Sequence, residues 1–145
     1  MRVIRNIHII TLLLSLSYSA TFQPQTTAEL QTAVDLWISD NDSALTSYGE
    51  INTWDVSLIT DMSALFKDKT DFNDDISSWD VSSVINMQEM FRNAVIFDQD
   101  ISGWDVSHVI YMEDMFKDAT SFNGDISSWD VSSVNDMYYM FYSAT

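Results

Sequence analysis

A unit that repeats with a fixed period, without insertion or deletion, fills the chain from Ile51 onward. Each unit begins Ile-x-x-Trp-Asp-Val-Ser, and its tryptophan returns at one constant interval, at Trp54, Trp79, Trp104 and Trp129. A period of this length is typical of a solenoid, in which each turn packs only against its neighbours. Residues that return in every turn are expected to build the turn, so the repeat favours a structural or binding role over catalysis.

The repeat array divides into four units, 51–75, 76–100, 101–125 and 126–145, and the last unit stops before its return loop. This incomplete unit predicts that the array continues in a longer protein. Residues 1–19 have the features of a secretory signal peptide: Arg2 and Arg5 precede a short apolar run, and small residues predict cleavage after Ser19. The run is shorter than the roughly 20 residues that span a bilayer. We therefore expect a secreted or cell-surface protein with no membrane span after cleavage.

Residues 20–50 lie outside the repeat and are expected to cap the first turn. Thr26 and Glu29 have the spacing of a capping box, with Thr26 as the N-cap of a helix. Asp40 and the polar residues after it should end this helix. Its apolar side chains follow the helical period, and they are Leu30, Ala33, Val34, Trp37 and Ile38. Such a stripe would cover the core face that the first turn otherwise exposes.

Each repeat is predicted to contain a strand, a helix and a return loop. Trp79 and Val81 stand two positions apart, so in a strand they share one face and the intervening Asp80 points away. The segment that follows has apolar residues at helical spacing, namely Met87, Met90, Phe91 and Ala94, and Asn86 precedes them as an N-cap. The return loop contributes one buried aromatic residue per turn: Phe72, Phe97 and Phe122. The predicted class is α/β, with one short parallel strand and one short helix in each turn.

The unit Ile-x-x-Trp-Asp-Val-Ser-x-Val-x-x-Met-x-x-Met-Phe-x-x-Ala-x-x-Phe-Asn-x-Asp resembles that of BspA-like leucine-rich-repeat surface proteins, in particular their mycoplasma-type 25-residue class of unknown function. The resemblance covers residues 28–145. It implies a right-handed leucine-rich-repeat-like solenoid in a secreted or surface protein linked to adhesion. Val84 departs from the leucine-rich-repeat signature, which has Asn or Cys at that position.

Composition narrows the partners and cofactors. The chain has 22 acidic and 6 basic residues and a net charge of −16, which disfavours nucleic acid and anionic lipid as partners. It has no cysteine, so disulfides and thiolate metal sites are excluded. His108 is the single histidine after the signal peptide and is expected to be exposed, because serine occupies its position in neighbouring repeats. One lone histidine makes neither a zinc site nor a catalytic triad.

An acidic column is the candidate metal site. Its members are Asp55, Asp80, Asp105 and Asp130, one in each repeat. Stacked in register at about 4.8 Å, they would repel one another unless a cation such as calcium bridged them. Loop acids of the same repeats, Asp75, Asp100 and Asp125, would add ligands. In the alternative interpretation each carboxylate accepts a hydrogen bond from a nearby backbone N–H or is simply solvated, with no cofactor bound.

The candidate binding residues are those that break the repeat consensus. Four tyrosines do so and are expected to be exposed: Tyr111, Tyr138, Tyr139 and Tyr142. Tyrosine is enriched at interfaces, which favours a module that binds an extracellular protein or glycan. The alternative is a structural surface or matrix protein that is stabilised by calcium and has no specific partner. An enzyme is not expected, because no acid or nucleophile stands out as confined to one repeat and facing a pocket.

Overall fold

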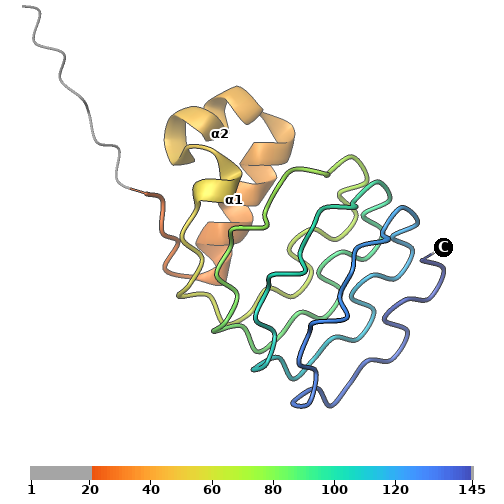
Figure 1. The fold of residues 1–145 in the computed structure, drawn as a ribbon. Coiled ribbons are helices and arrows are strands. Elements are labelled where there is room, and N and C mark those ends of the chain that lie inside the picture. The colour runs from red at the N-terminus through yellow and green to blue at the C-terminus, as the bar shows by residue number, and fades with distance from the viewer. Residues whose placement is uncertain (1–20, 145) are drawn as a thin grey trace, which may run out of the picture.

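The structure, a computed structural model, describes residues 21–144 as a helical cap followed by four stacked turns (Figure 1). Helix α1 spans Thr27–Ser39 and helix α2 spans Asn41–Tyr48, and a single 3-10 turn, η1, covers Ile51–Thr53. The four turns are 51–75, 76–100, 101–125 and 126–144. The predicted signal peptide, residues 1–19, lies outside the described residues.

The predicted fold class is wrong. Within residues 21–144 there is no strand longer than an isolated bridge, and no helix follows η1. The chain is therefore not an α/β leucine-rich-repeat-like solenoid. Each turn instead consists of consecutive tight turns, and the turns meet in one column of parallel bridges formed by Asp61, Asn86, Tyr111 and Asp136.

Hydrogen bonds between turns replace those of the predicted helix. In the first turn the N–H groups of Met62, Ala64 and Phe66 donate to carbonyls of the second turn, at 2.9 Å in each case. The N–H groups of Leu65 and Lys67, which alternate with them, donate locally, the latter to the Ala64 carbonyl at 3.1 Å. This alternation recurs in the second and third turns. Every second peptide therefore bonds to the neighbouring turn, which a continuous α-helix cannot do.

Left-handed residues produce this alternation. Each turn has two residues with positive φ, four positions apart, and none of them is glycine. All eight have φ between 54° and 61°, and the set is Ala64, Asp68, Glu89, Asn93, Asp114, Asp118, Tyr139 and Ser143. A left-handed residue interrupts an α-helix, although the side chains keep the i, i+3, i+4 spacing on the buried side.

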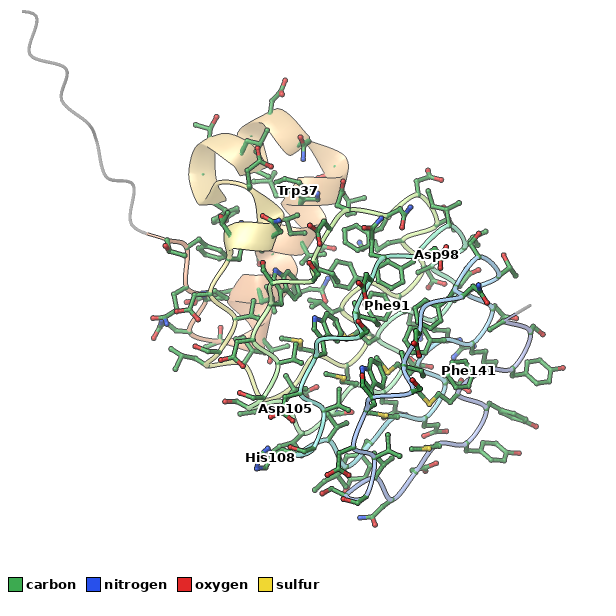
Figure 2. All side chains as sticks on the ribbon, viewed as in Figure 1. Trp37, Phe91, Asp98, Asp105, His108 and Phe141 are labelled. Atoms are coloured by element: carbon green, nitrogen blue, oxygen red, sulfur yellow. The ribbon has the colours of Figure 1, made fainter. Side chains whose placement is uncertain are left out.

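Stacked aromatic rings form the core of the column. Phe66, Phe91, Phe116 and Phe141 follow one another with ring centroids 5.4–5.5 Å apart and nearly parallel planes. A second row, Phe72, Phe97 and Phe122, runs beside the first at 5.9–6.0 Å spacing. Figure 2 shows Phe91 inside the stack and Phe141 in the last turn. The buried positions predicted from the repeat are thus correct except at Phe122, which is partly buried, although the predicted helix is wrong.

Tryptophan side chains join successive turns from inside. The Nε1–H of Trp79 donates to the Ile51 carbonyl at 2.8 Å, and Trp104 and Trp129 make the same bond to the corresponding isoleucine of the turn before. Asn73 and Asp98 form a second link at the return loop, where their side-chain oxygens accept from backbone N–H groups of the next turn. With the alternating backbone bonds, the first three turns are bonded to one another at three places around the circumference.

Helix α1 caps the stack, as the apolar pattern predicted. Thr26 is its N-cap and accepts from the Glu29 N–H at 3.2 Å, and four of the five predicted apolar residues are buried. Ile38 is the exception, with 39% of its surface exposed. The cap also satisfies backbone carbonyls of the first turn. Thr27 donates to the Asp61 carbonyl at 2.8 Å and Gln31 donates to that of Leu65 at 3.2 Å, the carbonyls that a preceding turn would otherwise bond.

Helix α2 was not predicted. Asp40 ends α1 and at the same time caps α2, because its side chain accepts from the Ser43 N–H. The polar run was interpreted as a terminator only, yet Asp is a favoured N-cap. Among residues 21–144 no helix is both long and apolar enough to cross a membrane.

Candidate functional site

One side of the stack varies from turn to turn, and we call it the variable face. It carries the outward side chains of the segment that includes the left-handed residues. Three columns compose it: Ser63, Gln88, Glu113 and Tyr138; Ala64, Glu89, Asp114 and Tyr139; and Lys67, Arg92, Lys117 and Tyr142. The repeat signature leaves these positions free, so their chemistry is not needed to build the turn.

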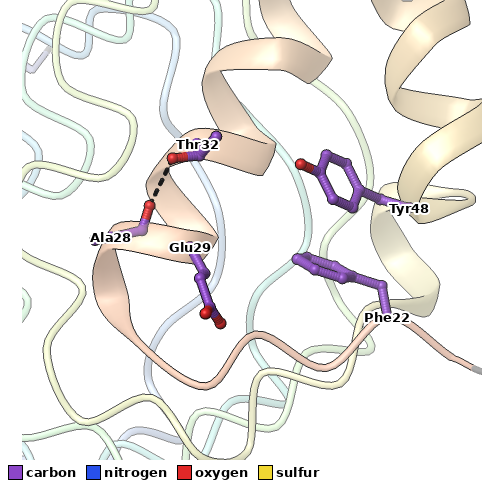
Figure 3. A pocket seen from close by; sticks show the side chains of 5 residues that line it. All are labelled: Phe22, Ala28, Glu29, Thr32 and Tyr48. Carbon is purple, nitrogen blue, oxygen red and sulfur yellow. Dashed lines mark hydrogen bonds between the residues drawn. The ribbon is translucent and has the colours of Figure 1, made fainter.

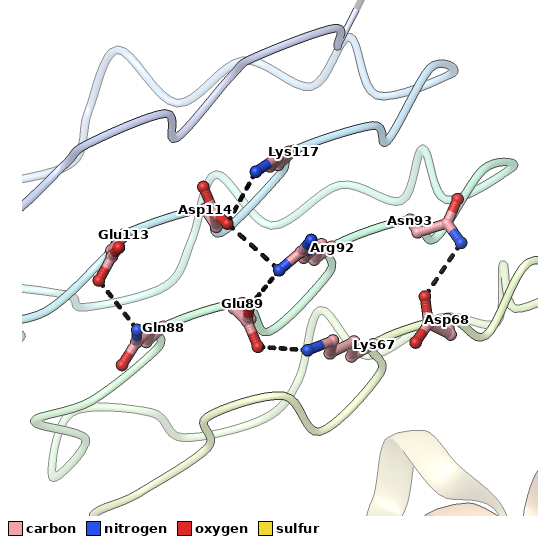
Figure 4. Close-up of polar contacts among 9 residues, drawn as sticks. All are labelled: Lys67, Asp68, Gln88, Glu89, Arg92, Asn93, Glu113, Asp114 and Lys117. Carbon is pink, nitrogen blue, oxygen red and sulfur yellow. Dashed lines mark hydrogen bonds and ion pairs between the residues drawn. The ribbon is translucent and has the colours of Figure 1, made fainter.

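Ion pairs run up the variable face from one turn to the next (Figure 4). Glu89 pairs with Lys67 of the turn below at 2.6 Å and with Arg92 of its own turn. Asp114 repeats the arrangement one turn later, with Arg92 at 3.4 Å and Lys117 at 3.1 Å. The hydrogen bond from Lys67, together with the nearby Arg92, holds the pKa of the Glu89 carboxyl below its usual value.

This ladder of ion pairs, which we call the charge ladder, ends on aromatic rings. In the fourth turn tyrosines occupy the positions of the acid and the base, and Lys117 lies 5.1 Å from the ring centroid of Tyr139 and 5.8 Å from that of Tyr142. A lysine over an aromatic face is attracted by the ring quadrupole. Beside them Asp114 is 7% exposed, and its Oδ1 has no hydrogen-bond partner among the described residues.

Three of the four predicted binding tyrosines lie together. Tyr138 and Tyr139 have ring centroids 3.9 Å apart, and those of Tyr139 and Tyr142 are 5.1 Å apart. All four tyrosines are exposed, as predicted, by 46–60%. Tyr111 is separate from this group, because it occupies the bridge column between Asn86 and Asp136. The three departures from the consensus in the last turn thus form one aromatic cluster.

The acidic column is built as a series of Asx turns. The Oδ1 atoms of Asp55, Asp80, Asp105 and Asp130 each accept from the N–H of the serine two positions later, at 3.0–3.1 Å. The loop acids Asp75, Asp100 and Asp125 do the same at 2.9–3.0 Å. These bonds have the geometry of the alternative interpretation, in which each carboxylate accepts a hydrogen bond from a nearby backbone N–H. No group of three or more acids or histidines able to hold a metal ion occurs among residues 21–144.

These Asx turns predict how stability responds to acid. The Ser57 hydroxyl and backbone N–H lower the pKa of Asp55, and serine contacts lower the pKa of Asp105 and Asp130 likewise. A lowered folded-state pKa means that the stabilisation is present above the unfolded value of 3.8 and is lost as pH falls through the folded value. We therefore expect the chain to lose stability as the pH falls from 3.8 through the lowered pKa values of these carboxyl groups in the folded state.

The variant with Asp55, Asp105 and Asp130 all changed to Asn should unfold less readily in acid. Asparagine keeps the Oδ1 acceptor but does not titrate, so the Asx turns survive at low pH. Circular dichroism recorded against pH compares it with the natural chain. The matched Asp→Ala variant, which lacks the acceptor, should be less stable at pH 7. Identical acid midpoints for the natural chain and the Asn variant would contradict this account.

Two acids confined to the first turn face a cavity, contrary to the sequence-based expectation that no such residue exists. Asp71 and Asp74 line a cavity of about 490 Å³ beside Trp37. Ile96 and Ser121 replace Asp71 in the next turns, and Gln99 and Gly124 replace Asp74. Alignment of the repeats by their period shows this difference, but the cavity forms only where the cap meets the first turn. Sequence reasoning therefore missed both residues.

A separate cavity of about 270 Å³ lies beside α1, lined by Phe22, Ala28, Glu29, Thr32 and Tyr48 (Figure 3). The ring centroid of Phe22 lies 4.4 Å from that of Tyr48, so the residues before α1 are packed onto the cap. The Glu29 carboxylate beside the cavity accepts from the Gln25 N–H at 2.7 Å. This hydrogen bond replaces the bond that a capping box makes to the N–H of its N-cap residue.

A helical cap on stacked 25-residue turns defines a tandem-repeat domain with a variable outer face. The chain belongs to the family described as Mycoplasma protein of unknown function, DUF285, whose model matches residues 36–145. This confirms the mycoplasma-type repeat predicted from the unit. No curated protein and no solved structure matches the chain.

Proposed function

We propose that this protein is a secreted or cell-surface binding module whose variable face contacts an extracellular protein or glycan. The observation that carries the proposal is the cluster of Tyr138, Tyr139 and Tyr142 beside the charge ladder. The resemblance of the repeat unit to BspA-like surface proteins supports an adhesive role, and the signal-peptide features of residues 1–19 support export. The family description itself gives no function.

The basic side chains of the variable face support its proposed role in binding a partner. The chain has six Lys and Arg residues, and Arg2 and Arg5 precede the described part, which leaves four. Three of these four lie on the variable face: Lys67, Arg92 and Lys117. A chain of net charge −16 repels most acidic partners, but on this face acids and bases alternate. An acidic or neutral partner therefore approaches this face at lower electrostatic cost than the rest of the acidic surface.

The chemistry of the face favours binding over catalysis. Glu89, Arg92 and Lys117 are held in ion pairs and are not poised as free acids or bases. The tyrosine rings supply amphipathic contact area at low entropic cost, since each has few rotatable bonds. Lys117 lies over two of the three rings and holds them in place. Exposed aromatic groups beside charged side chains are typical of contact surfaces.

A retention experiment on matched variants tests the proposal. The bait is the chain from residue 20, offered to an extracellular-matrix and cell-surface extract and to an array of immobilised glycans. The test variant changes Tyr138, Tyr139 and Tyr142 to Ser, and the control changes Leu58 and Ile96 to Ser, which are also exposed but lie off the variable face. We expect a partner that binds the natural chain and the control but not the test variant. Retention that all three share, or none at all, would contradict the proposal.

A further inference from the structure

A groove separates the helical cap from the return loop of the first turn. It consists of two adjoining cavities of about 490 and 260 Å³, which share Trp37, Glu50 and Asp74 in their walls. Asp71 lies in the larger cavity and Asp75 in the smaller. Ile38 and Leu45 of the cap helices form the apolar part of the larger cavity. We call this feature the acidic groove.

The acidic groove is a feature of one place in the molecule and not of the repeat. Its walls come from α1, α2 and the loop before the second turn, a junction that occurs once in residues 21–144. Asp71 and Asp74 have no acidic counterpart in the later turns. Neither residue is therefore required for building a turn, in contrast to the Asx-turn acids.

Hydrogen bonds orient Asp74 and Asp75 in the groove, and no basic side chain of the described residues lines it to neutralise the carboxylates. Trp37 donates from Nε1 to Asp74 Oδ2 at 2.8 Å, which holds that side chain against the aromatic wall. No Lys, Arg or His between residues 21 and 144 lines either cavity. Four carboxylates thus surround an apolar surface without a compensating base. Cations are the complementary ligands.

We propose that the acidic groove binds a basic peptide segment in which arginine or lysine side chains flank an apolar one. No three acids or histidines among residues 21–144 are grouped so that they could hold one metal ion, whereas a peptide with several basic side chains can face carboxylates spread along two joined cavities. An apolar side chain between the charges matches Ile38, Leu45 and the edge of Trp37. Arginine suits the rim best, because its guanidinium bonds carboxylates bidentately and stacks on aromatic rings. This site is distinct from the variable face.

Calorimetric titration with the synthetic peptide Arg-Leu-Arg-Arg-Leu-Arg tests the proposal on the chain from residue 20. The groove variant changes Asp71 and Asp74 to Asn, which removes two charges and leaves an oxygen for Trp37. The control changes Asp105 and Asp130 to Asn, which removes the same charge. Figure 2 shows Trp37 within the cap, at the top of the view, and Asp105 at the lower edge of the stack. Thermal unfolding of both variants verifies that they fold.

We expect the groove variant to bind the peptide about ten-fold more weakly, and the control variant less than about two-fold more weakly, than the natural chain. Equal weakening in both variants would overturn the proposal, because attraction to net charge alone would then explain binding. Absence of binding to the natural chain would overturn it too. A titration with calcium chloride forms a third arm: calcium binding that the groove variant loses, with peptide binding unchanged, would show an ion site instead.

Discussion

Replacing Phe91 by alanine should lower the free energy of unfolding by about 3–5 kcal/mol, the largest loss expected of any single truncation in the stack. Phe91 is fully buried, and its ring stacks on Phe66 below and Phe116 above at 5.4 and 5.5 Å. It also contacts Phe97 of its own turn at 4.0 Å. The alanine would leave a cavity in the centre of the column that rigid neighbouring rings cannot fill.

Urea denaturation followed by tryptophan fluorescence measures this loss. Phe141 provides the matched control, because it occupies the same position of the repeat in the last turn and is 46% exposed. Its replacement by alanine should cost about half as much, because roughly half of its surface already lies in water. Similar losses for the two variants would show that stacking within the column does not determine stability.

Replacing Val34 by aspartate should destabilise the chain by more than about 3 kcal/mol, because it buries an unpaired charge between α1 and the first turn. Val34 has no exposed surface and faces the stack together with Leu30 and Ala33. The expected result follows from the role of the cap: α1 covers the end of the core and bonds the carbonyls of Asp61 and Leu65.

Thr32→Asp is the control for the cap variant, since Thr32 lies on the exposed side of the same helix. It adds the same side chain without burial, and we expect a change within about 0.5 kcal/mol. Thermal unfolding by circular dichroism compares both with the natural chain. A Val34→Asp variant as stable as the control would mean that the cap does not contribute to the stability of the stack.

Local chemistry made the cap and the core predictable from sequence. The Thr26 cap and the spacing of Leu30, Val34 and Trp37 define a helix by rules that need no tertiary information. The repeat period likewise identified the buried tryptophans and phenylalanines, because positions that return as large apolar residues must face the same interior. Both predictions follow from residue types and their spacing along the chain, without knowledge of which backbone conformation the turn adopts.

The backbone of the repeat was not predictable by the same rules. The spacing of Met87, Met90 and Phe91 fits an α-helix, but it also fits successive turns that include a left-handed residue at Glu89. Only the hydrogen bonds to the neighbouring turns favour successive tight turns over an α-helix. The residues that accept these bonds lie about one repeat period away in sequence. Alanine, glutamate and tyrosine at such positions carry no left-handed signal. Asp68, Asn93 and Asp118 at the second position do carry one, because Asn and Asp adopt positive φ more readily, but the helical spacing of the apolar residues concealed it.

The candidate sites divide in the same way. The tyrosines that depart from the consensus were visible in the sequence, and three of them meet on one face because their positions belong to adjoining columns. The groove beside Trp37 depends on how α2 and the first return loop approach each other, and α2 itself was not predicted. The position of Asp74 in a cavity could therefore not be predicted from the sequence, because the cavity exists only in the tertiary structure.

The conformation of Ala64 provides the most direct test of the central claim. The claim is that the segment of each repeat that includes Ala64 or its equivalent consists of tight turns with left-handed residues, and that its backbone bonds to the neighbouring repeats. Ala64 has φ 56°, where glycine is at no steric disadvantage, so Ala64→Gly should raise the free energy of unfolding by about 1 kcal/mol. The control Ala28→Gly, in α1, should lower it. Urea denaturation of both variants gives the answer: a gain at Ala64 with a loss at Ala28 is the predicted result. A loss of about 1 kcal/mol at Ala64, as in a helix interior, would contradict the account.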